Sequence, residues 1–79
     1  MNPTIGRIVR YKVAAHDIAP IMNNGVKAGD YLPAVVVRVW GTETVNLRVL
    51  CDATNDAWKT SINPGAGEGQ WSWPPREPS

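Results

Sequence analysis

Two arginines in the segment VVVRVWGTETVNLRVL, residues 35–50, are the side chains best suited to bind a ligand. A guanidinium group is planar and offers paired N–H donors that fit phosphate or carboxylate oxygens. The segment has the β-branched composition of two strands joined by a short turn. Because side chains alternate along a strand, the apolar residues of both strands predict one buried face and place Arg38 and Arg48 on the opposite face.

The pairing of these two strands decides whether the arginines meet. A register that brings Val39 opposite Leu47 keeps the core-facing residues of both strands together. This register sets Arg38 directly across from Arg48, and like charges in that position destabilise a sheet. We therefore expect a negatively charged group to compensate the pair.

The next strand extends the same outer face. Alternation predicts Trp58, Thr60 and Ile62 in the core, so the intervening side chains point outward. The outer face then contains no acid and consists of Arg38, Trp40, Asn46, Arg48, Lys59 and Ser61. An anionic ligand stacked on an aromatic ring is one compensating partner, and a contact between subunits is another. A third alternative is a carboxylate of the same chain, for which the candidates are Asp30, Glu43, Asp52 and Glu68.

A second candidate site is the segment WSWPPR near the end of the chain. Trp71 and Trp73 are two residues apart and share a face of a short strand. With Arg76 they predict an aromatic wall with a cationic tip, suited to a planar ligand or a neighbouring subunit. The alternative is that one or both tryptophans plug the open end of the fold.

Other reactive residues give weaker hypotheses. His16 and Asp17 have the types of a general base and its orienting carboxylate, but no nucleophile is tied to them by sequence. Cys51 lies at the core end of a strand and is expected to act as a small buried hydrophobe. One cysteine and one histidine cannot complete a zinc site. We expect no metal, no cofactor and no enzymatic activity.

Five short strands are expected to position these residues. They cover residues 5–12, 31–40, 45–51, 57–62 and 70–73, and turn residues separate them. One long first connection and short later hairpins favour an all-β fold, a small five-stranded antiparallel SH3-like barrel over residues 1–73, with an extended proline-rich tail over 74–79. The alternative is a five-stranded sheet packed by a helix from residues 13–24.

Size and charge limit the classes of function. A chain of 79 residues is near the lower limit for a stable core, and its only cysteine cannot form an intrachain disulfide, so we expect a homo-oligomer. The formal net charge of +1 provides no field for nucleic acid or an anionic membrane. No apolar run reaches the roughly 20 residues of a membrane span. A single thiol fits a soluble protein of a reducing compartment.

The segments PTIGRIVRY, AGDYLPAVVVRVWG, VNLRVLCDATNDAWKTSI and GEGQWSWPPR together resemble a group of small proteins encoded by tailed phages and prophages. The resemblance covers nearly the whole chain, and its closing Trp-x-Trp-Pro-Pro-Arg is unusual. It implies a phage accessory protein in the cytoplasm of the bacterial host, or a minor virion component. Phage accessory proteins of this size include oligomeric sponges that sequester nucleotide second messengers of bacterial immune systems.

The leading hypothesis is therefore a self-assembling binding protein that sequesters a nucleotide or cyclic nucleotide. Arg38 and Arg48 would bind phosphate, while Trp40, Trp71 or Trp73 would stack on the base. A virion or protein–protein interaction module is the alternative. Binding of single-stranded nucleic acid is a further alternative, against which the near-neutral charge counts.

Overall fold

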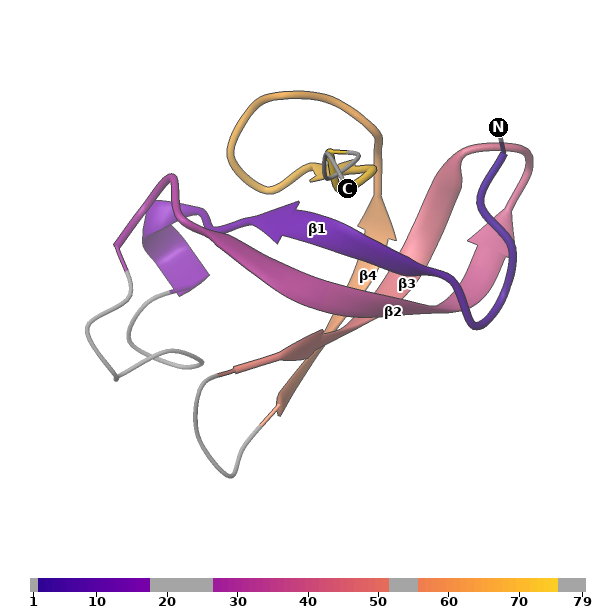
Figure 1. Cartoon of the computed structure of the whole chain (residues 1–79), viewed down its shortest axis with the longest axis horizontal. Helices are drawn as coiled ribbons and strands as arrows, with labels where there is room; N and C mark the ends of the chain where they lie inside the picture. The colour runs from indigo at the N-terminus through magenta and orange to yellow at the C-terminus, as the bar shows by residue number, and fades with distance from the viewer. Residues whose placement is uncertain (1, 18–26, 52–55, 76–79) are drawn as a thin grey trace.

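The computed structural model describes residues 2–17, 27–51 and 56–75 and contains one five-stranded antiparallel sheet (Figure 1). The strands are β1 (Ile8–Lys12), β2 (Tyr31–Trp40), β3 (Thr44–Leu50), β4 (Asp56–Ile62) and β5 (Trp71–Ser72), in the spatial order β4-β3-β2-β1-β5. One turn of 3-10 helix, η1 (Ala15–Asp17), follows β1. The all-β prediction is confirmed, whereas closure into a barrel stays a prediction. Of the alternative helix over 13–24, residues 18–24 lie outside the described residues.

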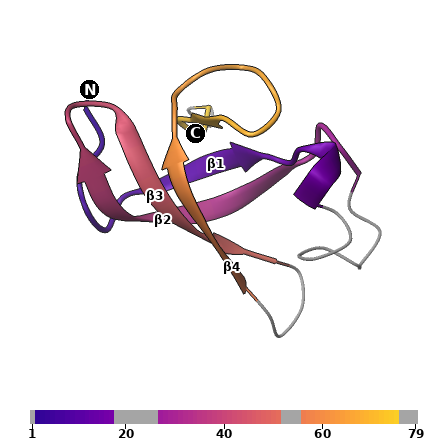
Figure 2. The same ribbon diagram turned by 180° about the vertical axis from the view of Figure 1, so that it is seen from behind.

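The sheet is strongly twisted, so that β3 and β4 cross β1 and β2 at a steep angle in both views (Figures 1 and 2). The segment 63–70 leaves the end of β4 and arches back over the sheet to β5. Two backbone hydrogen bonds attach it to β1, one from the Gly69 amide to the Lys12 carbonyl at 2.7 Å and one from the Lys12 amide to the Gln70 carbonyl at 3.0 Å. This arch brings Trp71 and Trp73 beside β1.

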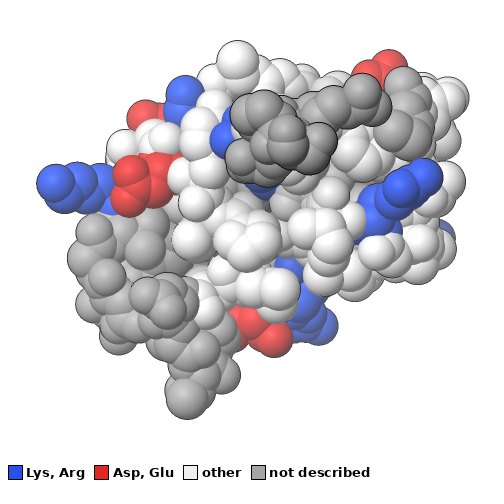
Figure 3. All heavy atoms as spheres, in the orientation of Figure 1, with Lys and Arg blue, Asp and Glu red and all other residues white. Residues whose placement is uncertain are grey.

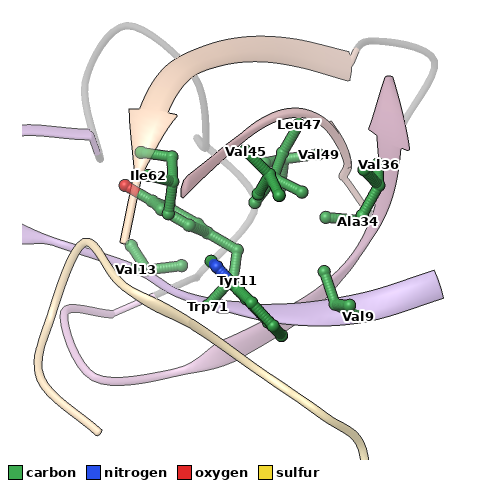
Figure 4. Close-up of a cluster of buried hydrophobic side chains, with 10 residues drawn as sticks. All are labelled: Val9, Tyr11, Val13, Ala34, Val36, Val45, Leu47, Val49, Ile62 and Trp71. Carbon is green, nitrogen blue, oxygen red and sulfur yellow. The ribbon is translucent and has the colours of Figure 1, made fainter. Parts of the chain in front are cut away.

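The concave side of the twisted sheet holds the core (Figure 4). Trp71 and Tyr11 are its largest fully buried side chains, and every strand contributes to it. The buried cluster consists of Val9, Tyr11, Val13, Ala34, Val36, Val45, Leu47, Val49, Ile62 and Trp71. Full burial of one such aliphatic side chain stabilises the fold by about 1.5–3 kcal/mol.

The register of β2 and β3 differs from the prediction. Val36, not Val39, lies opposite Leu47, and the ladder shifts between Val36 and Arg38. A bulge adds one residue to a strand and reverses the facing of the residues beyond it. Consequently Val36 is buried in the core, and Val37 is 40% exposed.

A second shift corrects the prediction for β4. Lys59 lies opposite the core residue Leu47, and Trp58 is 54% exposed, so Lys59 takes the core-facing position that Trp58 was predicted to hold. Thr60 is also exposed. The β3–β4 ladder shifts between Val45 and Leu47, and Ser61 has a φ of 57°. These irregularities reverse the facing of the β4 side chains once more, so that Ile62 is buried as expected.

The described residues form no helix long and apolar enough to cross a membrane. Their His, Cys, Asp and Glu side chains also do not gather in groups of three or more that would hold a metal ion. Pro74 and Pro75 follow β5 as exposed residues without regular structure.

Candidate functional site

The structure separates the two arginines of the predicted anion site. Arg48 lies opposite Val35 on one side and Trp58 on the other. Its Nη1 is 3.3 Å from Asp56 Oδ1, so a carboxylate of the same chain already accompanies it. Arg38 lies opposite Asn46, and its guanidinium stacks 3.9 Å above the Trp40 ring. The predicted juxtaposition of Arg38 and Arg48 is therefore wrong, because the partner of Arg38 on β3 lies two residues before Arg48.

Asn46 is a structural residue at the point where both ladders shift. Only 6% of it is exposed, and its Oδ1 accepts hydrogen bonds from Trp40 Nε1 at 3.0 Å, Thr60 Oγ1 at 3.0 Å and the Ser61 amide at 2.9 Å. One side chain thus ties β2 and β4 to β3. The Asn46 side chain is thus used within the sheet, whereas Ser61 contributes its backbone amide and is exposed.

Lys59 belongs to a buried cluster around Asp17, which is 0% exposed. Lys59 Nζ donates a hydrogen bond to Asp17 Oδ1 at 2.6 Å, and the Tyr11 hydroxyl donates to Oδ2. The Ala14 amide donates to the same Oδ2 at 3.1 Å. His16 Nε2 is 3.4 Å from Oδ1, but the His16 side chain is 77% exposed. The cluster connects β1, η1 and β4 and fixes the start of the long first connection.

The cluster sets a pH window for stability. Burial alone would raise the pKa of the Asp17 carboxyl, but the hydrogen bonds from Lys59, Tyr11 and Ala14 outweigh it and hold that pKa below its ordinary 3.8. Burial, followed by the hydrogen bond to Asp17 and its charge, raises the pKa of Tyr11 above its ordinary 10.0. Because folding lowers its pKa, the Asp17 carboxyl stabilises the fold above pH 3.8, and this stabilisation is lost as the pH falls through the pKa of the folded state. Because folding raises its pKa, the Tyr11 phenol stabilises the fold below pH 10.0, and this stabilisation is lost as the pH rises through the pKa of the folded state.

We therefore expect the melting temperature to form a plateau between about pH 5 and pH 9 and to fall on both sides. Thermal unfolding followed by circular dichroism measures the profile. The Tyr11→Phe variant is the matched control, because it removes the phenol and should flatten the alkaline decline; the acid decline should remain but move to higher pH, since one of the hydrogen bonds that lower the pKa of Asp17 is lost. An alkaline decline that is identical in Tyr11→Phe would contradict the assignment to this cluster.

Trp71 and Trp73 share a side of the chain end as predicted, and their rings pack edge to face with centroids 5.4 Å apart and planes at 89°. Trp71 is 2% exposed, and its Nε1 donates to the Glu43 carbonyl at 2.8 Å. Trp73 is half-buried and packs against the core from outside. The two tryptophans therefore divide the predicted roles, since Trp71 plugs the core and Trp73 forms a wall.

The wall belongs to an open groove of about 400 Å³ beside β5. Its cation is Arg10, whose guanidinium carbon lies 3.8 Å from the centre of the Tyr31 ring. Arg10 Nε is buried without a hydrogen-bond partner among the described residues. Lys12 Nζ lies 5.6 Å from the same ring and donates to the Ala66 carbonyl at 3.0 Å. The groove is lined by Arg10, Tyr31, Glu43, Pro64, Gly65, Ala66, Trp71, Ser72 and Trp73.

Sequence reasoning missed Arg10 and Tyr31 as site residues. The signal was present, because the charged residues of β1 alternate with its core residues and so share the outer face. What the sequence did not give is the pairing of β1 with β5, which sets Arg10 opposite Ser72 and next to the tryptophans. Arg76, the predicted cationic tip, lies outside the described residues, and the cation that lines the groove is Arg10.

Comparisons with protein-family models, with curated proteins and with solved structures find no match to this chain. The features of the chain that bear on function are therefore the groove, the cluster around Asp17 and the exposed surface of the sheet.

Proposed function

We propose that this protein is a non-enzymatic binding protein and that the groove beside β5 takes a planar anionic ligand of the nucleotide class. This proposed site lies at the junction of β1 and β5, whereas the sequence predicted a site on the outer face of β2 and β3. The supporting observation is Arg10, a guanidinium stacked on Tyr31 with a buried Nε that has no hydrogen-bond partner in the described part of the chain.

The environment of the Arg10 guanidinium favours an anionic ligand. A hydrogen bond from a guanidinium to a charged group contributes about 1.5–3 kcal/mol. Stacking on Tyr31 holds the guanidinium plane and leaves its in-plane donors for phosphate oxygens. Arg48, in contrast, is already accompanied by Asp56.

The walls of the groove favour a planar group beside the anion. Tyr31 and Trp73 present aromatic surface, and base stacking on such a ring contributes about 1–3 kcal/mol per base. Glu43 also lines the groove, and its carboxylate accepts hydrogen bonds from an amino or hydroxyl group of the ligand. The volume of about 400 Å³ lies in the range of small-molecule sites.

The positions of the groups with shifted pKa values support binding without turnover. The described groups with shifted pKa values are Tyr11, Asp17 and Cys51, and none of them lines the groove. Catalytic sites usually concentrate such groups in the cleft that holds the substrate. With the resemblance to phage-encoded proteins, this supports sequestration of a nucleotide in the bacterial cytoplasm as the biological role.

Replacing Arg10 with alanine is expected to weaken binding of a nucleotide about tenfold to a hundredfold, because a charge-assisted hydrogen bond is lost. Isothermal titration calorimetry with AMP and with cyclic di-AMP measures the affinity. The matched control is Arg38→Ala, which removes a guanidinium stacked at almost the same distance, 3.9 Å against 3.8 Å, but outside the groove. If both variants lose the same affinity, or wild type binds no nucleotide of a mono-, di- and cyclic panel, the proposal is wrong.

A further inference from the structure

The outer face of the sheet carries a row of side chains that crosses four strands. The ladders place Ile8 of β1 opposite Val35 of β2, Val35 opposite Arg48 of β3, and Arg48 opposite Trp58 of β4. Ile8 is 50% exposed and Trp58 is 54% exposed. We call these four residues the transverse row. Val37 and Leu50, each 40% exposed, add apolar surface near it.

We propose that the transverse row binds a second copy of this chain, face to face, around a two-fold axis that runs between β2 and β3. Such an axis brings β1 of one subunit over β4 of the other. Ile8 then contacts Trp58 of the second copy, and Val35 contacts the stem of its Arg48. Each contact occurs twice, as a two-fold interface requires. This inference goes beyond the proposed function and holds whatever the groove binds.

The charge of the row favours a second copy. Its single cation, Arg48, is neutralised by Asp56, and the two side chains are 47% and 49% exposed. The four residues of the transverse row therefore add no uncompensated charge to the contact. Trp and Arg are the residue types most enriched where protein interfaces contribute most energy, and Lys is depleted there. Figure 3 shows one side of the molecule, on which charged side chains of both signs are scattered among uncharged ones.

The structure also disfavours the common alternative, in which two copies pair through the edge strand β4. Lys59 on β4 points to the core side, and Ser61 has a positive φ next to the ladder shift. Inward charges and bulges are the devices that prevent strand edges from pairing. The β4 edge is therefore a less favourable surface for association than the face of the sheet. A core near the lower size limit gains stability from the apolar area that the contact covers.

Sedimentation equilibrium of the full-length chain tests the proposal. We expect wild type to have the mass of two chains and Trp58→Asp to associate about thirtyfold or more weakly, with an unchanged circular dichroism spectrum. The control is Ile5→Asp, which puts the same charge at a residue that is 71% exposed and precedes β1, and it should keep the mass of two chains. Ile8→Asp replaces Trp58→Asp if the latter does not fold.

A double variant tests the arrangement itself. Ile8 and Trp58 are three strands apart in one subunit, about 14 Å, too far for a direct ion pair. Across the proposed axis they meet, so Ile8→Lys combined with Trp58→Asp should regain association that Trp58→Asp alone loses. Wild type with the mass of one chain at every concentration overturns the proposal. So does an assembly that Trp58→Asp leaves intact, or a double variant that stays as weak as Trp58→Asp.

Discussion

Replacing Asp17 with alanine is expected to lower the free energy of unfolding by about 3–5 kcal/mol, the cost of removing one partner from a buried ion pair. The Tyr11 hydroxyl, the Ala14 amide and the Lys59 ammonium all lose their acceptor. The Lys59 side chain is only 19% exposed, so water replaces that acceptor poorly. Small domains have total stabilities at the low end of about 5–15 kcal/mol, and the loss would leave the variant marginally folded. Urea unfolding followed by tryptophan fluorescence measures it.

Two further variants separate charge from hydrogen bonding. Asp17→Asn keeps an acceptor for Tyr11 and Ala14 but removes the negative charge, so it should lose less than Asp17→Ala. Lys59→Met in the Asp17→Ala background removes the buried cation that has lost its partner, and we expect it to recover part of the stability. Strictly additive losses for Asp17→Ala and Lys59→Met would contradict a coupled pair, because residues in contact show interaction energies of about 0.5–3 kcal/mol.

The strands were predictable because β-branched runs and turn residues are local signals. The expected segment 31–40 coincides with β2, and the other four strands lie within a few residues of their expected positions. The facing of the apolar residues of β3 was also predictable, since Val45, Leu47 and Val49 are all buried, although Asn46 between them is buried as well. The register was not, because a run of valines such as 35–37 satisfies either facing equally well.

The β-bulges explain why the facing of the side chains was predicted wrongly over only part of the sheet. Strict alternation predicts that Trp58 and Thr60 share the core with Ile62, but the shift near Ser61 reverses facing between them. The side chain that stabilises this irregularity is Asn46, which binds the Ser61 amide. Asn46, a polar residue within a strand, therefore marks the bulge. From the sequence pattern alone, the same residue is predicted to point outward and contact a ligand.

The groove and the cluster depend on contacts between residues far apart in the chain. Lys59 and Asp17 are 42 positions apart, and no local pattern indicates that they pair. Arg10 reaches the tryptophans only because β5 pairs with β1. The sequence does show the tryptophans as a unit, since their spacing of two keeps them on one side of the chain, and their different burial follows from the arch over 63–70.

Trp71→Ala is expected to lower the free energy of unfolding by about 3–5 kcal/mol, whereas Trp73→Ala should leave the domain folded and weaken nucleotide binding. Trp71 is 2% exposed in the centre of the core, so its removal leaves a cavity, and the Glu43 carbonyl loses its donor. Trp73 is half-buried at the groove, and a lost stacking contact of about 1–3 kcal/mol corresponds to roughly fivefold to more than a hundredfold in affinity. Thermal unfolding and calorimetric titration with AMP, applied to both variants, measure the two effects.

Each tryptophan serves as the control for the other, because the rings touch and differ mainly in burial. Trp73→Phe keeps an aromatic wall and should retain most of the affinity that Trp73→Ala loses, while Trp71→Phe leaves part of the cavity and no indole donor, so it should remain destabilised. A Trp73→Ala variant that binds AMP as tightly as wild type would remove the aromatic wall from the site. In that case Arg10 and Tyr31 alone would hold the ligand, and the groove would be selective for the anion rather than for the planar group.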